Sequence, residues 1–251
     1  MVFGRSTWRR LLAPVAAVCL AAAAAGAARA HSSADLLAAC KNEADNAAAR
    51  IAACGRLIDD AATDEELRAE AHLQRGVLNE QSGNKEAAIQ DYSAAIKFDS
   101  SNALAYFNRG NVYDQMGEHD LAIADYTEAI KLDPSDADFF NNRGQVYDTK
   151  GEFELAIADY TEAIRLDPNN PRPFYNRGLA LANQGEYERA ISDLDQAIKL
   201  DPNDAESYAA RGAAHEEMDN EEAAREDYRR ALKINPDHEE AKEGLERLGD
   251  K

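Results

Sequence analysis

The sequence predicts an all-α solenoid, in which one small helical unit is repeated along the chain. The segment Arg109–Asp136 recurs 34 residues later as Arg143–Asn170, and within it Leu121–Ile130 is identical to Leu155–Ile164. A period of this length indicates a unit that cannot bury its apolar face alone and therefore stacks on its own copies. Five full units follow one another without insertion, at residues 69–102, 103–136, 137–170, 171–204 and 205–238.

Residues 1–30 are expected to be a secretory signal and are set apart from the fold. Three arginines precede residues 11–27, which are apolar and rich in alanine, and small residues at 28 and 30 suit cleavage after Ala30. The apolar run is short and weakly hydrophobic for a membrane span, so a cleaved signal is favoured over a retained anchor. We therefore expect an exported protein, either periplasmic or secreted, and the composition of the signal suggests a bacterial one.

Residues 31–68 are interpreted as a degenerate sixth unit, with short helices over 33–42 and 46–60. Loss of the signal removes Cys19 and leaves Cys40 and Cys54. An exported chain enters an oxidising compartment, where such a pair is a candidate disulfide. Aligned with the later units, the two cysteines lie on facing helices of one hairpin. A bridge there would contribute about 3 kcal/mol, and the alternative is two buried thiols.

Small residues at fixed positions predict close packing between the two helices of each unit. Position eight is always glycine, and positions twenty and twenty-seven are always alanine. Glycine inside a helix costs about 1 kcal/mol relative to alanine, so five in register require a packing reason, which is the close approach of a neighbouring helix. Aromatic residues at positions four and twenty-four are expected to fill the core between helices. The five glycines are Gly76, Gly110, Gly144, Gly178 and Gly212.

Glycine and proline also mark where the helices of each unit end. A second glycine series separates two apolar stretches and suits a left-handed helix stop. Asp219 breaks this series and predicts a last turn that is either somewhat strained or differently shaped. A proline at position thirty-two ends the second helix of four units, because proline cannot continue a helix. Residues 239–251 are expected to form a charged helix that caps the last apolar face.

This arrangement resembles the tetratricopeptide repeat, a 34-residue helix–turn–helix with small residues at positions eight, twenty and twenty-seven and proline at thirty-two. The resemblance covers residues 69–238, with departures at His72, Ser100 and Asp219. It implies a right-handed superhelix whose first helices line a concave groove. It also implies a protein–protein interaction scaffold without catalytic activity.

Two charged series recur in all five units, arginine at position seven and aspartate at position twenty-three. The arginines could form a ladder that binds anions, or each could pair with the aspartate of its own hairpin. Because the two series occur together in equal number, the pairing is favoured. The arginines are Arg75, Arg109, Arg143, Arg177 and Arg211, and the aspartates are Asp91, Asp125, Asp159, Asp193 and Asp227.

The resemblance implies which residues face the groove. Asparagines at position six could hydrogen-bond the backbone of an extended peptide, or they could be surface amides that bind water. Apolar or adaptable contacts are expected beside them, together with acids from a row at position twelve. The asparagines are Asn108, Asn142 and Asn176, the contacts are Phe107, Asn111, Tyr175 and Leu179, and the acids are Asp114 and Asp148.

The charge balance narrows the class of partner. The formal net charge is −19, and loss of the signal would remove four of the 28 basic residues and none of the 47 acids, which gives −23. Because phosphate binding depends on Lys and Arg, nucleic acid and anionic membrane are disfavoured as partners. A neutral or basic segment with apolar anchors is favoured. The alternative is that the acidity serves solubility and the acidic row is ordinary helix surface.

No motif in the sequence predicts catalysis, a cofactor or a metal site. The five histidines are scattered, and there is no nucleophile elbow or glycine-rich phosphate loop. We therefore expect a non-catalytic scaffold of the cell envelope whose partner is another exported or envelope protein. Two alternatives are an adaptor or regulatory subunit of an envelope enzyme and a structural protein that self-associates through its ends.

Overall fold

The predicted all-α solenoid is confirmed by the structure, a computed structural model that describes residues 32–249. That part of the chain consists of thirteen helices without a strand. The expected signal at residues 1–30 lies outside the described residues. The helices are α2 (Ser33–Lys41), α3 (Ala47–Asp59), α4 (Glu65–Gln81), α5 (Lys85–Phe98), α6 (Ala103–Gln115), α7 (His119–Leu132), α8 (Ala137–Thr149), α9 (Phe153–Leu166), α10 (Pro171–Asn183), α11 (Tyr187–Leu200), α12 (Ala205–Glu217), α13 (Glu221–Ile234) and α14 (Glu239–Arg247).

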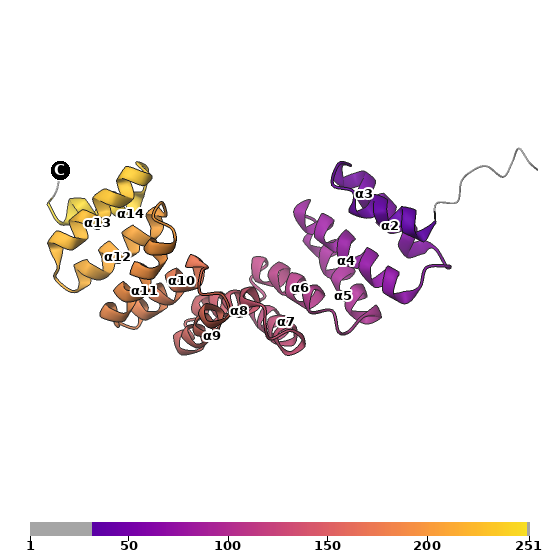
Figure 1. Cartoon of the computed structure of the whole chain (residues 1–251), viewed down its shortest axis with the longest axis horizontal. Helices are drawn as coiled ribbons and strands as arrows, with labels where there is room; N and C mark the ends of the chain where they lie inside the picture. The colour runs from indigo at the N-terminus through magenta and orange to yellow at the C-terminus, as the bar shows by residue number, and fades with distance from the viewer. Residues whose placement is uncertain (1–31, 250–251) are drawn as a thin grey trace, which may run out of the picture.

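The helix pairs follow one another along an arch (Figure 1). Helices α6, α8 and α10 lie along its inner side, and α7, α9 and α11 run along its outer side. The first helices of neighbouring units also contact one another, from α4 through to α12. They therefore form one continuous inner surface. None of the helices within residues 32–249 is long and apolar enough to cross a membrane.

The two ends of the array differ from the five central pairs. Helix α4 begins at Glu65, four residues ahead of the unit boundary at Ala69, so it is one turn longer than the other first helices. Before it, α2 and α3 form a hairpin in which the Cys40 and Cys54 sulfurs are bonded at 2.01 Å. This pair packs on Leu78 of α4. At the other end, α14 packs on both α12 and α13.

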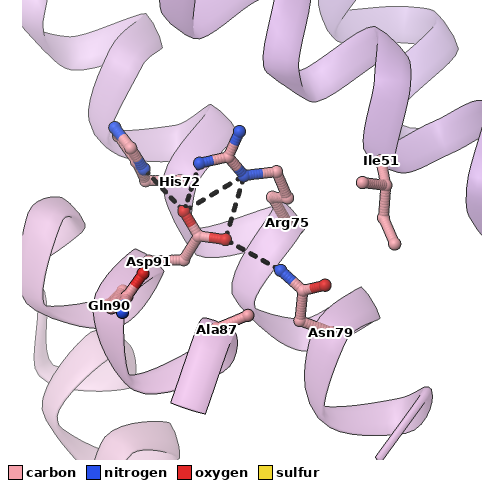
Figure 2. A pocket seen from close by; sticks show the side chains of 7 residues that line it. All are labelled: Ile51, His72, Arg75, Asn79, Ala87, Gln90 and Asp91. Atoms are coloured by element: carbon pink, nitrogen blue, oxygen red, sulfur yellow. Dashed lines mark hydrogen bonds and ion pairs between the residues drawn. The ribbon is translucent and has the colours of Figure 1, made fainter. Parts of the chain in front are cut away.

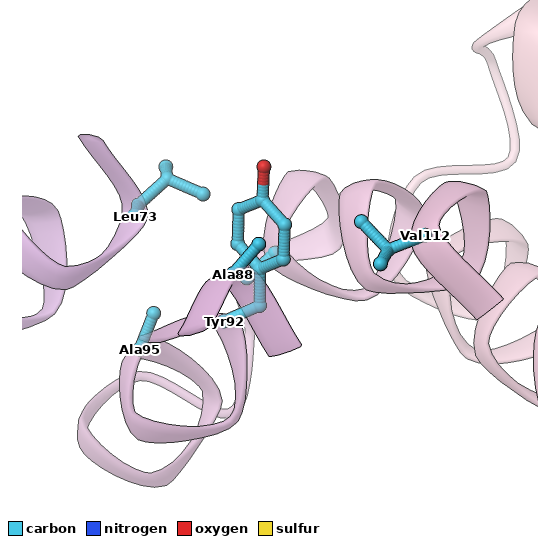
Figure 3. Close-up of a cluster of buried hydrophobic side chains, with 6 residues drawn as sticks. Leu73, Ala88, Tyr92, Ala95 and Val112 are labelled. Atoms are coloured by element: carbon cyan, nitrogen blue, oxygen red, sulfur yellow. The ribbon is translucent and has the colours of Figure 1, made fainter. Parts of the chain in front are cut away.

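The glycine at position eight is explained by the side chain of the facing helix, which is a tyrosine ring in four units and Leu194 in the fourth unit. A Cβ atom added at Gly76 would lie 2.6 Å from the Tyr92 ring, and one at Gly144 would lie 2.8 Å from the Tyr160 ring. The close approach predicted from the repeat is therefore confirmed. Figure 3 shows Tyr92 in the buried cluster between the helices, with Leu73 on one side of it.

The aspartate-rich turns between units serve as caps for the helices. Asp133 follows the last residue of α7 and accepts a hydrogen bond from the backbone N–H of Ser135 at 3.0 Å. Asp136 then caps α8 by accepting from the N–H of Asp138 at 2.9 Å. Short polar side chains are preferred at both places because they satisfy backbone groups that the helix leaves unpaired. These turns therefore have a structural role in every unit.

Each arginine at position seven pairs with the aspartate of its own hairpin, so the pairing interpretation is confirmed. Nε and Nη2 of Arg143 lie 2.8 Å from the two carboxylate oxygens of Asp159. Nη1 of the same arginine donates to the hydroxyl of Thr127 in the preceding unit at 3.0 Å. One guanidinium therefore connects α7, α8 and α9. The same two contacts recur at Arg109, Arg177 and Arg211.

The strained last turn predicted at Asp219 is also confirmed. Asp219 has a φ of 56°, whereas the other four turns place glycine there, for example Gly151 at 75°. A side chain in this left-handed region meets the backbone and costs roughly 1–2 kcal/mol, somewhat less for aspartate. The turn between α12 and α13 is therefore strained in a way that the others are not.

We expect Asp219→Gly to raise the free energy of unfolding by about 0.5–1 kcal/mol, because it relieves this strain at an exposed position. Urea denaturation followed by circular dichroism measures the change. The matched control is Gly151→Ala, where a Cβ meets nothing within 4 Å and only the backbone conformation resists it. That variant is expected to lose about 1 kcal/mol. Unchanged stability in both variants would contradict the strain.

The Cys40–Cys54 pairing is tested by a thiol count. We expect no reactive thiol at either position in the denatured, unreduced protein, and two after reduction, as read by mass spectrometry of the peptide that contains both. Replacing both by serine is expected to destabilise the α2–α3 hairpin by about 3 kcal/mol, since the bridge closes a short loop. Hydrogen exchange would show the loss in α2 and α3 and leave α8 and α9 protected. Two thiols before reduction would disprove the bridge.

Candidate functional site

Two adjoining hollows lie beside the first helices of the C-terminal units, and Tyr175 of α10 lines both of them. The first, about 340 Å³, lies between the start of α10 and the turn before α12 and includes Asn176. The second, about 470 Å³, is lined by residues of α8, α10, α11, α12 and α14, including Asp148 and Leu179. Four of the predicted contact residues therefore line one or both of these hollows.

Two other predicted asparagines belong to a hydrogen-bonded chain of amides across the first helices. The Oδ1 atom of Asn111 accepts from the Tyr126 hydroxyl at 2.7 Å and from Asn142 Nδ2 at 3.0 Å. Asn142 Oδ1 in turn accepts from Asn141 Nδ2 at 3.3 Å, and Asn141 Oδ1 accepts from Asn176 Nδ2 at 3.0 Å. The chain connects α6, α8 and α10.

Asn141 is the link in this chain that the sequence reasoning missed. It is 1% exposed, and it stands at position five, where the other units carry Leu73, Phe107, Tyr175 and Ala209. An amide in an otherwise apolar or aromatic series was the available signal. Because a buried amide needs partners, Asn141 orients Asn142 and Asn176 toward one another.

The amides retain capacity for a ligand after these bonds are counted. Each side-chain NH₂ group has two hydrogens, so Asn142 and Asn176 each keep one. Asn111 uses only its oxygen in the chain, so its NH₂ group remains. Asn108 is half-buried on α6 and lies outside this chain of bonds. Three of the four predicted asparagines are thus brought together.

Phe107 is placed between units rather than on an open surface. Its ring centroid lies 4.8 Å from that of Phe139 on α8 and 5.7 Å from that of Tyr126 on α7. Such spacings are those of packed aromatic pairs. Phe107 therefore contributes to the contact between two units, and changing it would disturb packing as well as any groove surface.

Most acids of the row at position twelve have partners within the protein. The tyrosine at position twenty-four donates to Glu80 at 2.7 Å in the first unit and to Glu216 at 2.7 Å in the last. Glu216 also accepts hydrogen bonds from the guanidinium of Arg247 in α14. In the second unit Asp114 lies 3.2 Å from the ring nitrogen of His119.

Asp148 is the exception in this row. Its Oδ1 atom is buried and accepts no hydrogen bond. Burial raises the pKa of this carboxyl above its ordinary value of 3.8. Burial likewise raises the pKa of Tyr175 to about 12, with Glu206 and Asp204 adding to the effect, so that Tyr175 stays protonated as a hydrogen-bond donor. The second hollow therefore combines an unpartnered carboxylate with a neutral phenol.

A third hollow, of about 430 Å³ between α3, α4 and α5, is centred on Asp91 (Figure 2). The Asp91 carboxylate accepts from Arg75 and Asn79 and lies 2.9 Å from the His72 ring nitrogen. Burial acts to raise the pKa of Asp91, but the hydrogen bonds from His72 and Arg75 outweigh it and hold that pKa low. This carboxylate is fully paired and reads as structural. Within residues 32–249 no group of three or more His, Cys, Asp or Glu is placed to hold a metal ion.

Family models for the tetratricopeptide repeat match most of the repeat region. Taken together they cover residues 81–238 without a gap, which is more than half of the chain. The model described as "Tetratricopeptide repeat" matches 103–136 and 205–238, a second of that description matches 125–158, and the model described as "TPR repeat" matches 81–117, 149–185 and 180–219.

Solved structures with the same architecture include YrrB, described as a TPR protein with an unusual peptide-binding site. It is 26% identical, with a TM-score of 0.66, over 77% of this chain and 97% of that one. PilF of Pseudomonas aeruginosa (22%, TM-score 0.65, 74% and 86% covered) and MamA of Desulfovibrio magneticus (17%, 0.64, 68% and 97%) share the fold. No curated protein matches the chain.

We expect Asp148→Asn to stabilise the protein at neutral pH. The raised pKa means that the folded protein holds this proton more tightly than the unfolded chain does. The carboxylate therefore lowers stability at pH values above its folded pKa, and the penalty shrinks as the pH falls through and below 3.8, where both states become protonated. The expected gain in unfolding free energy is roughly 1 kcal/mol at pH 7 and approaches zero below about pH 3.

Urea titrations at several pH values measure this gain, with Asp114→Asn as the matched control. Asp114 already has a partner in His119, so its amide is expected to bring no gain. Equal behaviour of the two variants would show that the buried Asp148 oxygen carries no cost.

Proposed function

Since the chain belongs to the tetratricopeptide repeat family, we propose that it is an interaction scaffold of the cell envelope. It binds an extended segment of another exported or envelope protein along its first helices. The observation that carries this proposal is the pair of adjoining hollows that meet at Tyr175, next to the amide chain of α6, α8 and α10.

The amides and the hollows offer complementary kinds of contact. The free N–H groups of Asn111, Asn142 and Asn176 can donate to the carbonyls of an extended backbone without reading its sequence. The hollows beside Tyr175 and Leu179 can then take apolar side chains. The peptide-binding site described for YrrB, which is 26% identical, supports this assignment.

The electrostatic character of the surface favours a neutral or basic segment. Among residues 32–249, Arg172 is the only base that lines either hollow, and it lies beside Asp201, Asp204 and Glu206. A ligand carboxylate would meet mostly negative charge there, whereas a basic segment would be attracted. A partner with apolar anchors and few acids fits best.

Export is the second part of the proposal. It rests on the composition of residues 1–30 and is supported by the Cys40–Cys54 bridge, because such bridges persist mainly in oxidising compartments. In this setting a preformed rigid surface binds with little ordering cost of its own, so the cost falls on the bound segment.

A random dodecapeptide library displayed on phage and selected on the immobilised protein tests the groove. We expect enriched peptides to bind the unmodified protein and to lose at least about tenfold in affinity to Tyr175→Ala/Leu179→Ala, a loss of about 1.4 kcal/mol. Fluorescence polarisation with the synthetic peptides measures the affinities, and thermal melts confirm that each variant is folded.

The matched control is Leu121→Ala/Leu155→Ala, which removes two leucines of the outer helices that are about half exposed. This variant is expected to keep the affinity of the unmodified protein. Equal binding by the groove variant, or loss in the outer variant, would move the site away from the first helices. Failure to enrich any peptide, together with a concentration-dependent mass in ultracentrifugation, would favour self-association instead.

A further inference from the structure

The second hollow exists because several side chains that are larger in other units are alanine here. Position twelve is acidic in the other four units but is Ala182 in α10. In α12, Ala210 stands where the three central units have asparagine, and Ala213 replaces a larger residue of all four earlier units. Ala214 replaces the leucine or valine of the first three units, and the fourth already has Ala180 there. These alanines, with Leu179, give the hollow a narrow apolar wall.

The charged groups of the hollow are all acidic. Asp148 comes from α8, Glu217 from α12 and Glu240 from α14, and no lysine or arginine of the described part of the chain lines the hollow. Glu217 already accepts from the Tyr187 hydroxyl at 3.3 Å, and both glutamates are exposed to solvent. Asp148 differs from them, since its Oδ1 atom is buried and unpartnered.

We propose that this hollow receives a lysine or arginine side chain of the bound segment, with Asp148 as its counter-ion. The inference rests on the proposed function and names the chemistry of one of its anchors. The aliphatic stem of such a side chain would lie along Leu179 and the alanines, and its cationic head would reach the acids.

The state of Asp148 before binding makes this pairing favourable. An acid on open surface loses water when a cation binds, and most of the attraction is spent on that loss. Folding has already removed water from the Asp148 oxygen, and the raised pKa of this carboxyl reflects that burial. An arriving cation therefore supplies a hydrogen bond that the carboxylate lacks. A norleucine side chain, which has the four carbons of lysine but no ammonium group, would fill the apolar part of the same space without that bond.

The experiment uses two probes that share a four-carbon side chain and differ in the terminal ammonium group, Nα-acetyl-lysinamide and Nα-acetyl-norleucinamide, titrated into the ¹⁵N-labelled protein and followed by NMR. We expect the lysine probe to shift the backbone resonances of Leu179, Ala210 and Ala214 with millimolar affinity. Asp148→Asn is expected to weaken it about tenfold or more, the loss of a hydrogen bond to a charged group. The norleucine probe is expected to bind at least tenfold more weakly than the lysine probe.

Asp114→Asn is the matched control, because it removes an acid of the same row that already has a partner. It should leave the affinity of the lysine probe within twofold. Equal affinity of the two probes would make the hollow purely apolar. An unchanged affinity in Asp148→Asn would assign the attraction to the exposed acids. Either result overturns the proposal, as does the absence of shifts at the hollow.

The outcome is separable from that of the proposed function. Selected peptides that bind the unmodified protein but not the groove variant, together with a lysine probe that does not bind, would support the proposed function and rule out the cation site. If no peptide is selected and the lysine probe still binds through Asp148, the hollow is a cation site without the proposed groove.

Discussion

The arginine at position seven of each unit is the contact on which the stacking of this protein depends. In the third unit, Arg143 holds Asp159 across its own hairpin and Thr127 of the unit before. Its guanidinium also lies over the rings of Phe140 and Tyr147, at 5.9 Å from each centroid. Removing either Arg143 or Asp159 would leave a mostly buried charge unpaired, which costs several kcal/mol. The pair therefore fixes how each unit packs on the preceding unit.

The first unit shows what happens where the preceding neighbour cannot complete this contact. Gly55 of α3 lies beside the Arg75 guanidinium, at the place where later units present a hydroxyl or carboxylate. Asp91 is held instead by additional donors of its own unit, His72 and Asn79. His72 departs from the aromatic residue that later units carry, so the departure compensates for a degenerate neighbour. The hollow around Asp91 is thus an adaptation of packing.

The division between structural and variable positions decides what the sequence can predict. Positions that contact the same partner in every unit could be predicted, because five copies of the unit repeat the same contact. These positions are the glycine that faces an aromatic ring in most units, the arginine that pairs with aspartate, and the left-handed turn residue, which is strained where it is Asp219. The pairing of Cys40 with Cys54 was expected from two residues alone, with two buried thiols as the alternative, and the structure places the two sulfurs 2.01 Å apart.

Features that arise where two different units pack together could not be predicted from the sequence. The amide chain needs Asn141, whose partners belong to α8 and α10, and the packing of Phe107 depends on Phe139 of the next unit. The second hollow is assembled from five helices between Asp148 and Glu240. A repeat predicts the same contact at the same position of every unit. These features instead depend on which units depart from the repeat and on how much the side-chain volume changes there.

Asp148 shows how small such a difference can be. In the first and last units the acid at position twelve is glutamate, and its longer side chain reaches the tyrosine hydroxyl of the facing helix at 2.7 Å. In the third unit the acid is one methylene shorter, Tyr160 occupies the tyrosine position, and the Asp148 oxygen stays buried without a partner. A carboxylate that has one oxygen already buried and unpaired gains a hydrogen bond when a cation reaches it. The shorter side chain lacks the tyrosine contact that glutamate makes, and where Asp114 is partnered by His119 the third unit carries Phe153, so Asp148 is left available to a ligand.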